Sequence, residues 1–569
     1  MAGNHDFLRG EMNVTGRVGS IGGIELSHVF SASAMERDFD ADYAHLKQRA
    51  VSEAILAQLT KSSSLLLEVE WSQRNSTPAV TATPWVVNRV GSRYVYTPQV
   101  AYDLMNFNQS GPTGRQDREV LTTTLTYENR FSEVWSARVS GYHYNRGAYN
   151  FNSSAGDQYD PILRIITSRN PTRSQLNEDG GAVQADLLAH YWLANRTLEN
   201  KTLITFDWTT NWRYRHETKP LTAIFPNSDV NVANPVYTVP HESLFNIVTR
   251  DDHTRNDVMG VYLRQQTAMF NGRLIGFAGV RYDHVTFNLE FGDQFNVGGS
   301  KPGSLNNAGT LDHFTDSAWS PNVGLNYKLI KNLAVYANYS RSFFPNAQAS
   351  RLGDPRLPNE RAEGYDFGFK GSFFADRLNF TLGAFAIERT GVKATLVENG
   401  TTVDRAAGEQ QAEGVEFDFT WRMTDELTLL GGYGYTDAQI SNNGRDLDSV
   451  GRRPNGVPQD NGGLALKFSF GGNLRGFALT AGVKYLGEAN PNSLATVAGG
   501  NPDLARRNTV APSSITYDAG LSYSWSQQSD GLRHAVRLSG RNLSDKRYVM
   551  PNFSAGTSRE VFFSYSLRH

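Results

Sequence analysis

The most regular feature of this sequence is an alternation of apolar and polar side chains with a period of two. In residues 201–215 one face of the pattern carries Ile204, Phe206, Trp208, Trp212 and Tyr214. The other face carries Thr205, Asp207, Thr209, Asn211, Arg213 and Arg215. Helical periodicity is scarce, so the pattern predicts β-strands. A soluble sandwich could show it too, but aromatic rings opposite arginines and an aspartate favour lipid on one side and water on the other.

Applied to the whole chain, the alternation predicts about 21 strands. They are expected at residues 12–20, 23–34, 48–58, 64–74, 119–129, 134–147, 182–194, 200–216, 256–271, 273–288, 317–329, 332–344, 362–374, 377–391, 411–423, 426–440, 458–471, 473–488, 513–526, 532–547 and 558–568. Tight turns such as Asn271-Gly272 alternate with long loops at 75–118, 148–181, 217–255, 289–316 and 489–512. Bacterial outer-membrane barrels have short periplasmic turns and long extracellular loops. The sequence therefore predicts an all-β fold, a transmembrane antiparallel β-barrel.

The strand count and the composition refine this prediction. Because single-chain bacterial barrels close with an even number of strands, an odd count indicates one more strand before residue 12. The 569 residues carry a net charge of −2, which gives no reason to expect a nucleic-acid partner. The chain has no cysteine, which excludes disulfides and cysteine metal sites. No apolar run reaches about 18 residues, so no transmembrane helix is expected.

Six segments form an ordered series of short motifs. They read GVYLRQQ at 260–266 with GVRYD at 279–283, SPNVGLNY at 320–327 with VYANYSRSFFP at 335–345, LPNERAEGYDFGFK at 357–370, AFAIERT at 384–390, EGVEF at 413–417 and NLSDKRY at 542–548. Each motif is weak alone. Their order over about 300 residues resembles the TonB-dependent outer-membrane receptors, in particular the ferric-siderophore receptor branch.

This resemblance implies a barrel of the 22-strand receptor type. Residues 6–16 resemble its second strand, which would make residues 1–3 the end of the first. The signal peptide, the TonB-contacting box and the plug domain that usually come first have no counterpart in the chain. We therefore expect one domain, residues 1–569, an outer-membrane β-barrel that lacks the plug domain and most of the first strand. His569 stands where the family usually ends in phenylalanine, which leaves recognition by the assembly machinery open.

The resemblance also implies a function, the uptake of ferric siderophores across the outer membrane of a Gram-negative bacterium. The siderophore would be a transported ligand, with no cofactor and no enzymatic activity. In the family, the TonB–ExbB–ExbD complex acts through the plug, so this chain would reach that complex only through a segment it lacks. We expect a monomer in outer-membrane lipid. The alternatives are a passive plugless pore, a surface adhesin or phage receptor, and a receptor for haem, cobalamin or oligosaccharide.

Aromatic side chains in the long loops are the candidates for ligand contact. The 75–118 loop contains Trp85, Tyr94, Tyr96 and Tyr102, and the next loop contains Tyr149 and Tyr159 with Arg164. Aromatic rings offer rigid contact area, and arginines form charge-assisted bonds to hydroxamate or carboxylate oxygens. Packing between loops, or an interfacial aromatic belt, is the alternative role for the same residues.

No catalytic or metal site is expected. Asp251, Asp252 and His253 with Asp257 could offer ligands to a cation, but their spacing is not diagnostic. A solvated loop at the mouth of a strand is the simpler interpretation. The glycines at 431–434 lie inside a strand pattern, which predicts close packing of the pleat and not a phosphate site.

Overall fold

The structure is a computed structural model of the chain. It describes residues 1–569 except 79–84, 91–92, 99–105, 109, 155–157, 161–162, 168–169, 221–229, 238–241, 292–293, 296–304, 307–310, 346–356, 399–400, 444–449, 455, 490–508, 527–530, 549 and 551–555. Of β6 and β7, defined below, only the backbone is described. In the described residues, no helix is long and apolar enough to cross a membrane.

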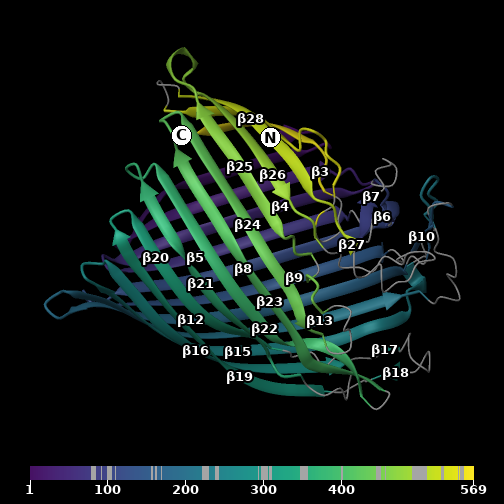
Figure 1. Ribbon diagram of the computed structural model, residues 1–569, viewed down its shortest axis with the longest axis horizontal. Helices are drawn as coiled ribbons and strands as arrows, with labels where there is room; N and C mark the ends of the chain where they lie inside the picture. Colours follow the sequence, from purple (N-terminus) through teal and green to yellow (C-terminus); the bar gives the residue numbers. More distant parts are fainter. Residues whose placement is uncertain are drawn as a thin grey trace.

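A closed sheet of 22 strands makes up nearly the whole molecule (Figure 1). Its strands are β1 (Ala2–Gly3), β2 (Leu8–Ile21), β3 (Ile24–Asp38), β4 (His45–Thr60), β5 (Ser63–Thr77), β8 (Arg115–Arg130), β9 (Trp135–Ser154), β12 (Asn170–Leu193), β13 (Leu198–Lys219), β15 (Ile247–Met269), β16 (Leu274–Phe291), β19 (Leu311–Ile330), β20 (Leu333–Phe344), β21 (Glu360–Phe373), β22 (Leu378–Glu398), β23 (Thr401–Arg422), β24 (Leu427–Asn442), β25 (Asp460–Ser469), β26 (Phe477–Leu486), β28 (Ser514–Ser526), β29 (Arg533–Arg541) and β30 (Glu560–Arg568). Each is antiparallel to the next along the chain, and β1 also pairs with β30, which closes the barrel. The predicted fold is confirmed.

Each of the 21 expected strands coincides with one strand from β2 to β30, and β1 is the strand that the odd count required. The expected boundaries are wrong on the long-loop side. There β12 begins at Asn170 and β15 at Ile247, well inside segments expected to be loops. In these extensions both faces of the sheet are polar, so the alternation that marks a strand in the sequence disappears.

The long connections contain small sheets of their own, gathered at one end of the barrel (Figure 1). One joins β6 (Trp85–Val90), β7 (Arg93–Pro98) and β27 (Thr509–Val510), and a second joins β10 (Gln158–Asp160), β11 (Ile165–Thr167) and β14 (Val230–Asn231). A third pairs β17 (Gln294–Phe295) with β18 (Leu305–Asn306). Short 3-10 helices lie at Gly111–Thr113, Glu242–Leu244 and Gly472–Leu474. The opposite end of the barrel carries the tight turns, as at Asn271 and Gly272, whose φ angles of 56° and 74° are left-handed.

The wall has an apolar outer face and a polar inner face. On β13, the outward Ile204, Phe206 and Trp212 are 43%, 42% and 52% exposed, because they face the surroundings of the barrel and not a protein core. The expected outward set of β30 is likewise exposed and consists of Val561, Phe563, Tyr565 and Leu567. The glycines at 431–434 lie within β24, as predicted, and a Cβ on Gly432 would collide with the Asp418 carboxylate.

The wall has a seam where the two ends of the sheet meet. Because β1 is two residues long, Ala2 pairs with Leu8 on one side, and Ala2 and Gly3 pair with Phe563 and Phe562 on the other. All 14 residues of β2 are exposed, including Ile21 at 71%. Within the described residues, β2 and β30 therefore present backbone edges that are largely unpaired beyond this short contact.

Candidate functional site: the lumen wall and the loop assembly

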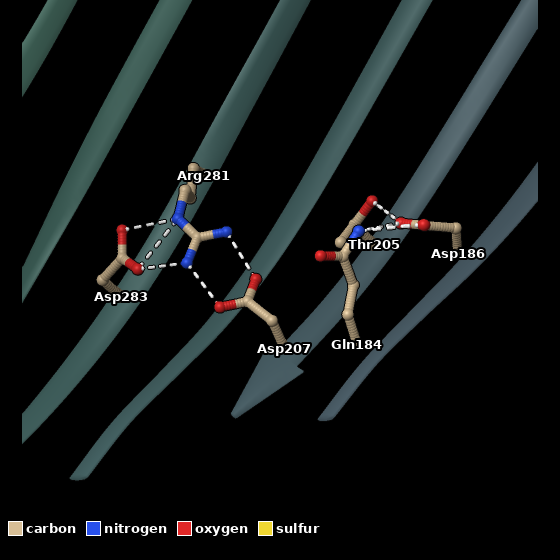
Figure 2. Close-up of polar contacts among 6 residues, drawn as sticks. All are labelled: Gln184, Asp186, Thr205, Asp207, Arg281 and Asp283. Carbon is tan, nitrogen blue, oxygen red and sulfur yellow. Dashed lines mark hydrogen bonds and ion pairs between the residues drawn. The ribbon is translucent and has the colours of Figure 1, made fainter. Parts of the chain in front are cut away.

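An arginine held between two carboxylates marks the middle of the inner wall (Figure 2). The Arg281 Nη1 and Nη2 groups donate to the two oxygens of Asp207, at 2.6 and 2.9 Å. Its Nε donates to both oxygens of Asp283, at 2.8 and 3.0 Å. These residues lie on β13 and β16 on either side of β15. Every nitrogen of the guanidinium is engaged, so this cluster braces the wall and leaves Arg281 little capacity for a ligand.

Two glycines make room for this arrangement. Gly260 on β15 lies opposite both Asp207 and Asp283, and a Cβ there would collide with the Arg281 guanidinium. Gly279 leaves space for Tyr262, whose hydroxyl would lie 2.6 Å from a Cβ at that position. The GVYLRQQ and GVRYD motifs therefore have a physical meaning, because their glycines admit large inward side chains from the neighbouring strands.

A second polar cluster lies beside the first and belongs to β12 and β13 (Figure 2). The Thr205 hydroxyl donates to Asp186 at 2.6 Å, and Gln184 donates to both carboxylate oxygens at 3.1 and 2.9 Å. The side chains of the two clusters belong to three strands, β12, β13 and β16, and the Arg281 cluster reaches across β15. Hydrogen bonds thus fix the positions of these polar side chains on the inner wall, which faces a water-filled lumen.

Nearer the loop end, the inner wall is rich in arginine and tyrosine. On β9 the side chains of Tyr142, Tyr144 and Arg146 follow one another on the inward face, and the two tyrosine rings are 5.8 Å apart. On the two strands before β9, Arg74 and Arg118 lie directly opposite each other. Arg146 is paired with Glu178 at 3.4 Å. These positions are not among the loop residues predicted to contact ligand, although their place on the polar face of the alternation was a usable signal.

Above this wall, three connections pack into one loop assembly, defined by Tyr43, Phe107, Val230, Val232 and Tyr237. Phe107, Val230 and Val232 are buried, with exposures of 1%, 2% and 4%. The Tyr237 ring stacks on Phe107 at 5.9 Å and meets Tyr43 edge-on at 5.8 Å. These residues come from the β3–β4, β5–β8 and β13–β15 connections. These contacts therefore join connections at the barrel mouth that are far apart in the sequence.

The predicted ligand residues are divided among three places. Trp85, Tyr94 and Tyr96 share the β6–β7–β27 sheet, where only their backbone positions are described. Tyr159 lies on β10, and Arg164 lies in the turn before β11, where its carbonyl accepts a hydrogen bond from Val232 at 2.8 Å.

The remaining two predicted residues differ in how far the structure describes them. Tyr149 belongs to β9 of the barrel wall, under the Arg115 guanidinium at 5.4 Å, and not to a loop. Tyr102 lies outside the described residues. The backbone thus places Trp85, Tyr94 and Tyr96 in one small sheet, and the ligand role of all seven stays a prediction.

The acidic segment at 251–257 belongs to β15, so the interpretation as a solvated loop is wrong. Asp252 points inward, is 2% exposed and pairs with Arg250. Asp251 and Asp257 lie on the outer face, and Asp257 pairs with Arg255 at 2.7 Å. Because alternate side chains of a strand point to opposite faces, the Asp252 carboxylate is separated from those of Asp251 and Asp257. In the part of the chain that the structure describes, no group of three or more His, Cys, Asp or Glu side chains could hold a metal ion.

The lumen contains a cavity of about 1630 Å³ along β23 to β30. Its inward lining includes Asp418, Lys484, Asp518, Arg537 and Phe562. Lys484 and Asp518 are paired at 2.8 Å. The cavity is large, open and bordered by charges of both signs, which suits passage of a polar solute better than permanent retention of an apolar one.

Comparison with known proteins identifies the barrel. A family model described as "TonB dependent receptor-like, beta-barrel" matches residues 61–543. The chain belongs to this family. As a TonB-dependent receptor barrel it is a protein of the Gram-negative outer membrane, and it belongs with receptors and transporters and not with enzymes.

Individual relatives agree with the family assignment. An uncharacterized TonB-dependent receptor of Haemophilus influenzae is 28% identical over 344 residues, 58% of this chain and 90% of that protein. The metal-pseudopaline receptor CntO of Pseudomonas aeruginosa is 28% identical over 457 residues, 79% of this chain and 59% of that receptor. The chain thus spans well under two thirds of the length of CntO.

A solved structure shows the same fold. The ferric preacinetobactin receptor BauA of Acinetobacter baumannii superimposes with a TM-score of 0.81 at 15% identity, covering 99% of this chain and 78% of that one. The family match confirms the TonB-dependent receptor barrel predicted from the ordered motifs, and this structure agrees with it in fold.

Proposed function

We propose that this TonB-dependent receptor barrel serves in the uptake of ferric siderophores. The observation that carries the proposal is the sequence relationship to receptors of metal chelates. Besides CntO, the ferrioxamine B receptor of Salmonella typhimurium is 24% identical over 456 residues, 79% of this chain and 54% of that receptor. The polar inner wall supports a bulky, water-soluble ligand.

The proposal includes the energy source and the domain organisation. In this family the inner-membrane TonB–ExbB–ExbD complex drives transport through the plug. Residues 1–569 form one barrel domain in this proposal, and active transport requires a plug domain that these residues do not supply. The barrel acts as a monomer in outer-membrane lipid, and the siderophore is its cargo.

Uptake of radioactive iron tests the proposal. Residues 1–569 are produced with and without the plug domain of a related receptor, in bacteria that lack their own siderophore receptors. Ferric hydroxamate, catecholate and mixed-type chelates are offered in turn, with haem and cobalamin as comparisons. We expect the fusion to import at least one ferric chelate, only when TonB is present. Import of haem or cobalamin instead, or import that is independent of TonB, would contradict the proposal.

A passive pore is the second candidate, favoured by the 1630 Å³ lumen cavity. Planar-bilayer recordings of residues 1–569 distinguish the two functions, because an open 22-strand barrel conducts steadily. A large current that is indifferent to ferric chelates, together with absence of chelate uptake by the fusion, would favour the pore. Blockage of the current by a chelate that the fusion imports would favour the receptor.

A further inference from the structure

Two arginines face each other across neighbouring strands of the inner wall with no counter-charge between them. Arg74 on β5 and Arg118 on β8 are direct partners in the antiparallel register, so their side chains leave the sheet on the same face. Glu70 and Thr122 are also direct partners, four residues along each strand from the arginines, and their side chains point to the same side. That face is the lumen, because Trp71 and Leu121 alternate with the arginines and point outward.

The arrangement is unfavourable as it stands. Like charges directly opposite each other in a sheet repel. Arg146 on β9 adds to the repulsion that acts on Arg118. Among the described residues, neither Arg74 nor Arg118 makes an ion pair or a side-chain hydrogen bond, and both are exposed to the lumen. Arg281 on the same inner wall is by contrast paired with two carboxylates, those of Asp207 and Asp283.

The direct opposition of two like charges on the lumen face indicates a binding role. A repulsive pair persists at a cost to stability when it is arranged for a partner that compensates it. Two guanidinium groups side by side offer planar, forked donors that match carboxylate or phosphate oxygens. Below them Tyr142 and Tyr144 present rings on the same face, and Tyr142 is 40% exposed. The loop assembly lies above, so the pair is positioned just inside the mouth.

We propose that Arg74 and Arg118, supported by Arg146, form an oxyanion subsite of the lumen that takes a carboxylate-bearing or phosphate-bearing small molecule entering from the loop side. The subsite deepens the proposed uptake function and rests on it for its physiological role. The same oxyanion chemistry is offered by a free anion and by the anionic arm of a metal chelate. Tyr142 would contact the adjoining part of the ligand.

Titration calorimetry with citrate and inorganic phosphate tests the subsite on residues 1–569 in a nonionic detergent, with trehalose as a neutral comparison. The variants are Arg74→Gln, Arg118→Gln and both together. Arg49→Gln is the matched control. Arg49 lies on the outer face of β4 opposite Gln73, the neighbour of Arg74, so this substitution removes the same charge from the other side of the wall. We expect the double variant to bind citrate about tenfold more weakly than the parent, and the control to bind like the parent.

Heat-dependent mobility in gel electrophoresis supplies a second readout. Each single glutamine variant should unfold at a higher temperature than the parent, because it relieves the repulsion while it weakens citrate binding. Citrate should raise the unfolding temperature of the parent and not of the double variant. Unchanged citrate binding in the double variant, equal loss in the control, or no citrate or phosphate binding by the parent would overturn the subsite.

The test also separates this subsite from the proposed function. Calorimetry needs no plug and no TonB, so the subsite can fail while the fusion still imports iron. Conversely, citrate binding that depends on Arg74 and Arg118 stands even if no ferric chelate is transported. A ferric-citrate titration and a citrate titration, compared side by side, distinguish recognition of a metal chelate from recognition of the free anion.

Discussion

Arg281 joins β13 to β16 across the intervening strand through one side chain. Its carboxylate partners differ in environment, since the Asp207 side chain is 22% exposed and that of Asp283 is 7% exposed. The Arg281 guanidinium between them offsets the electrostatic repulsion between the two carboxylates, which the strand register brings close together. The strength of the cluster therefore depends on keeping all three members.

We expect Arg281→Met to destabilise the barrel by about 2 kcal/mol, because it leaves the buried Asp283 carboxylate and the half-buried Asp207 carboxylate without their shared partner. Urea unfolding of protein reconstituted in phosphocholine vesicles measures the loss. Arg17→Met is the control, since Arg17 pairs with Glu25 at 78% and 60% exposure and its removal should cost less than about 0.5 kcal/mol. The triple variant Arg281→Met, Asp207→Asn, Asp283→Asn should recover most of the stability. Equal losses in Arg281→Met and Arg17→Met would show that the cluster does not brace the wall.

The sequence shows the inward face of such residues but not their partners. Alternation alone placed Asp207 and Arg213 on the polar face of β13. That Asp207 meets Arg281, 74 positions later, depends on the register between strands, which no local pattern encodes. The same reason hid the opposition of Arg74 and Arg118. The predicted loop aromatics had the reverse problem, because their residue types indicated binding while their mutual arrangement depended on pairing between distant loops.

At the scale of elements, β3 and β4 contain a hydrogen-bonded histidine–glutamate pair on the outer face of the wall. His28 Nδ1 lies 2.9 Å from Glu53 Oε1. The register places both beside Phe30, Val69 and Ile55, on the side opposite the lumen-facing Glu68. Ionisable groups on a lipid-facing surface are rare and costly unless they are paired.

We expect His28→Val to destabilise the barrel by about 1–3 kcal/mol in vesicles, because it leaves the Glu53 carboxylate alone on a lipid-facing surface. The double variant His28→Val, Glu53→Val should be as stable as the parent or more so, since apolar side chains replace the whole pair. Urea titration near neutral pH measures both. A double variant less stable than the single one would indicate that the pair contacts something other than lipid.

Strands were the elements that the sequence predicted best, because lipid and water impose opposite requirements on alternate residues. The prediction lost accuracy where that contrast ends. Above the apolar band, β9, β12 and β13 have polar residues on both faces, so their extensions were taken for loops. The small sheets of the connections were missed for a related reason, since two- to six-residue strands carry too few positions to establish a period.

At the scale of the whole molecule, the barrel of residues 1–569 is closed through the short strand β1. Backbone groups within a bilayer must be hydrogen-bonded, and among the described residues the facing edges of β2 and β30 find backbone partners in Met1 to Asn4. Because Ala2 lies opposite Phe563, four residues added before Met1 would reach Arg568.

We expect a four-residue Thr-Val-Thr-Val extension before Met1 to raise the unfolding temperature, because each hydrogen bond regained at an edge contributes about 0.5–1.5 kcal/mol. Heat-dependent gel mobility measures the shift. An extension of the same length with proline at alternate positions is the control, since proline donates no hydrogen bond and should give little gain. If both extensions raise the temperature equally, the effect is not strand pairing.

The longest strand has a consequence for how the cell surface meets its surroundings. β12 has 24 residues, and at a rise of about 3.3 Å per residue and a tilt of about 45° it stands roughly 55 Å tall. The apolar band of such barrels is about 25 Å high. Roughly half of β12 therefore extends beyond the bilayer as a regular strand. Antibodies and bacteriophages that approach the bacterium would contact this extended strand end before they reach the lipid.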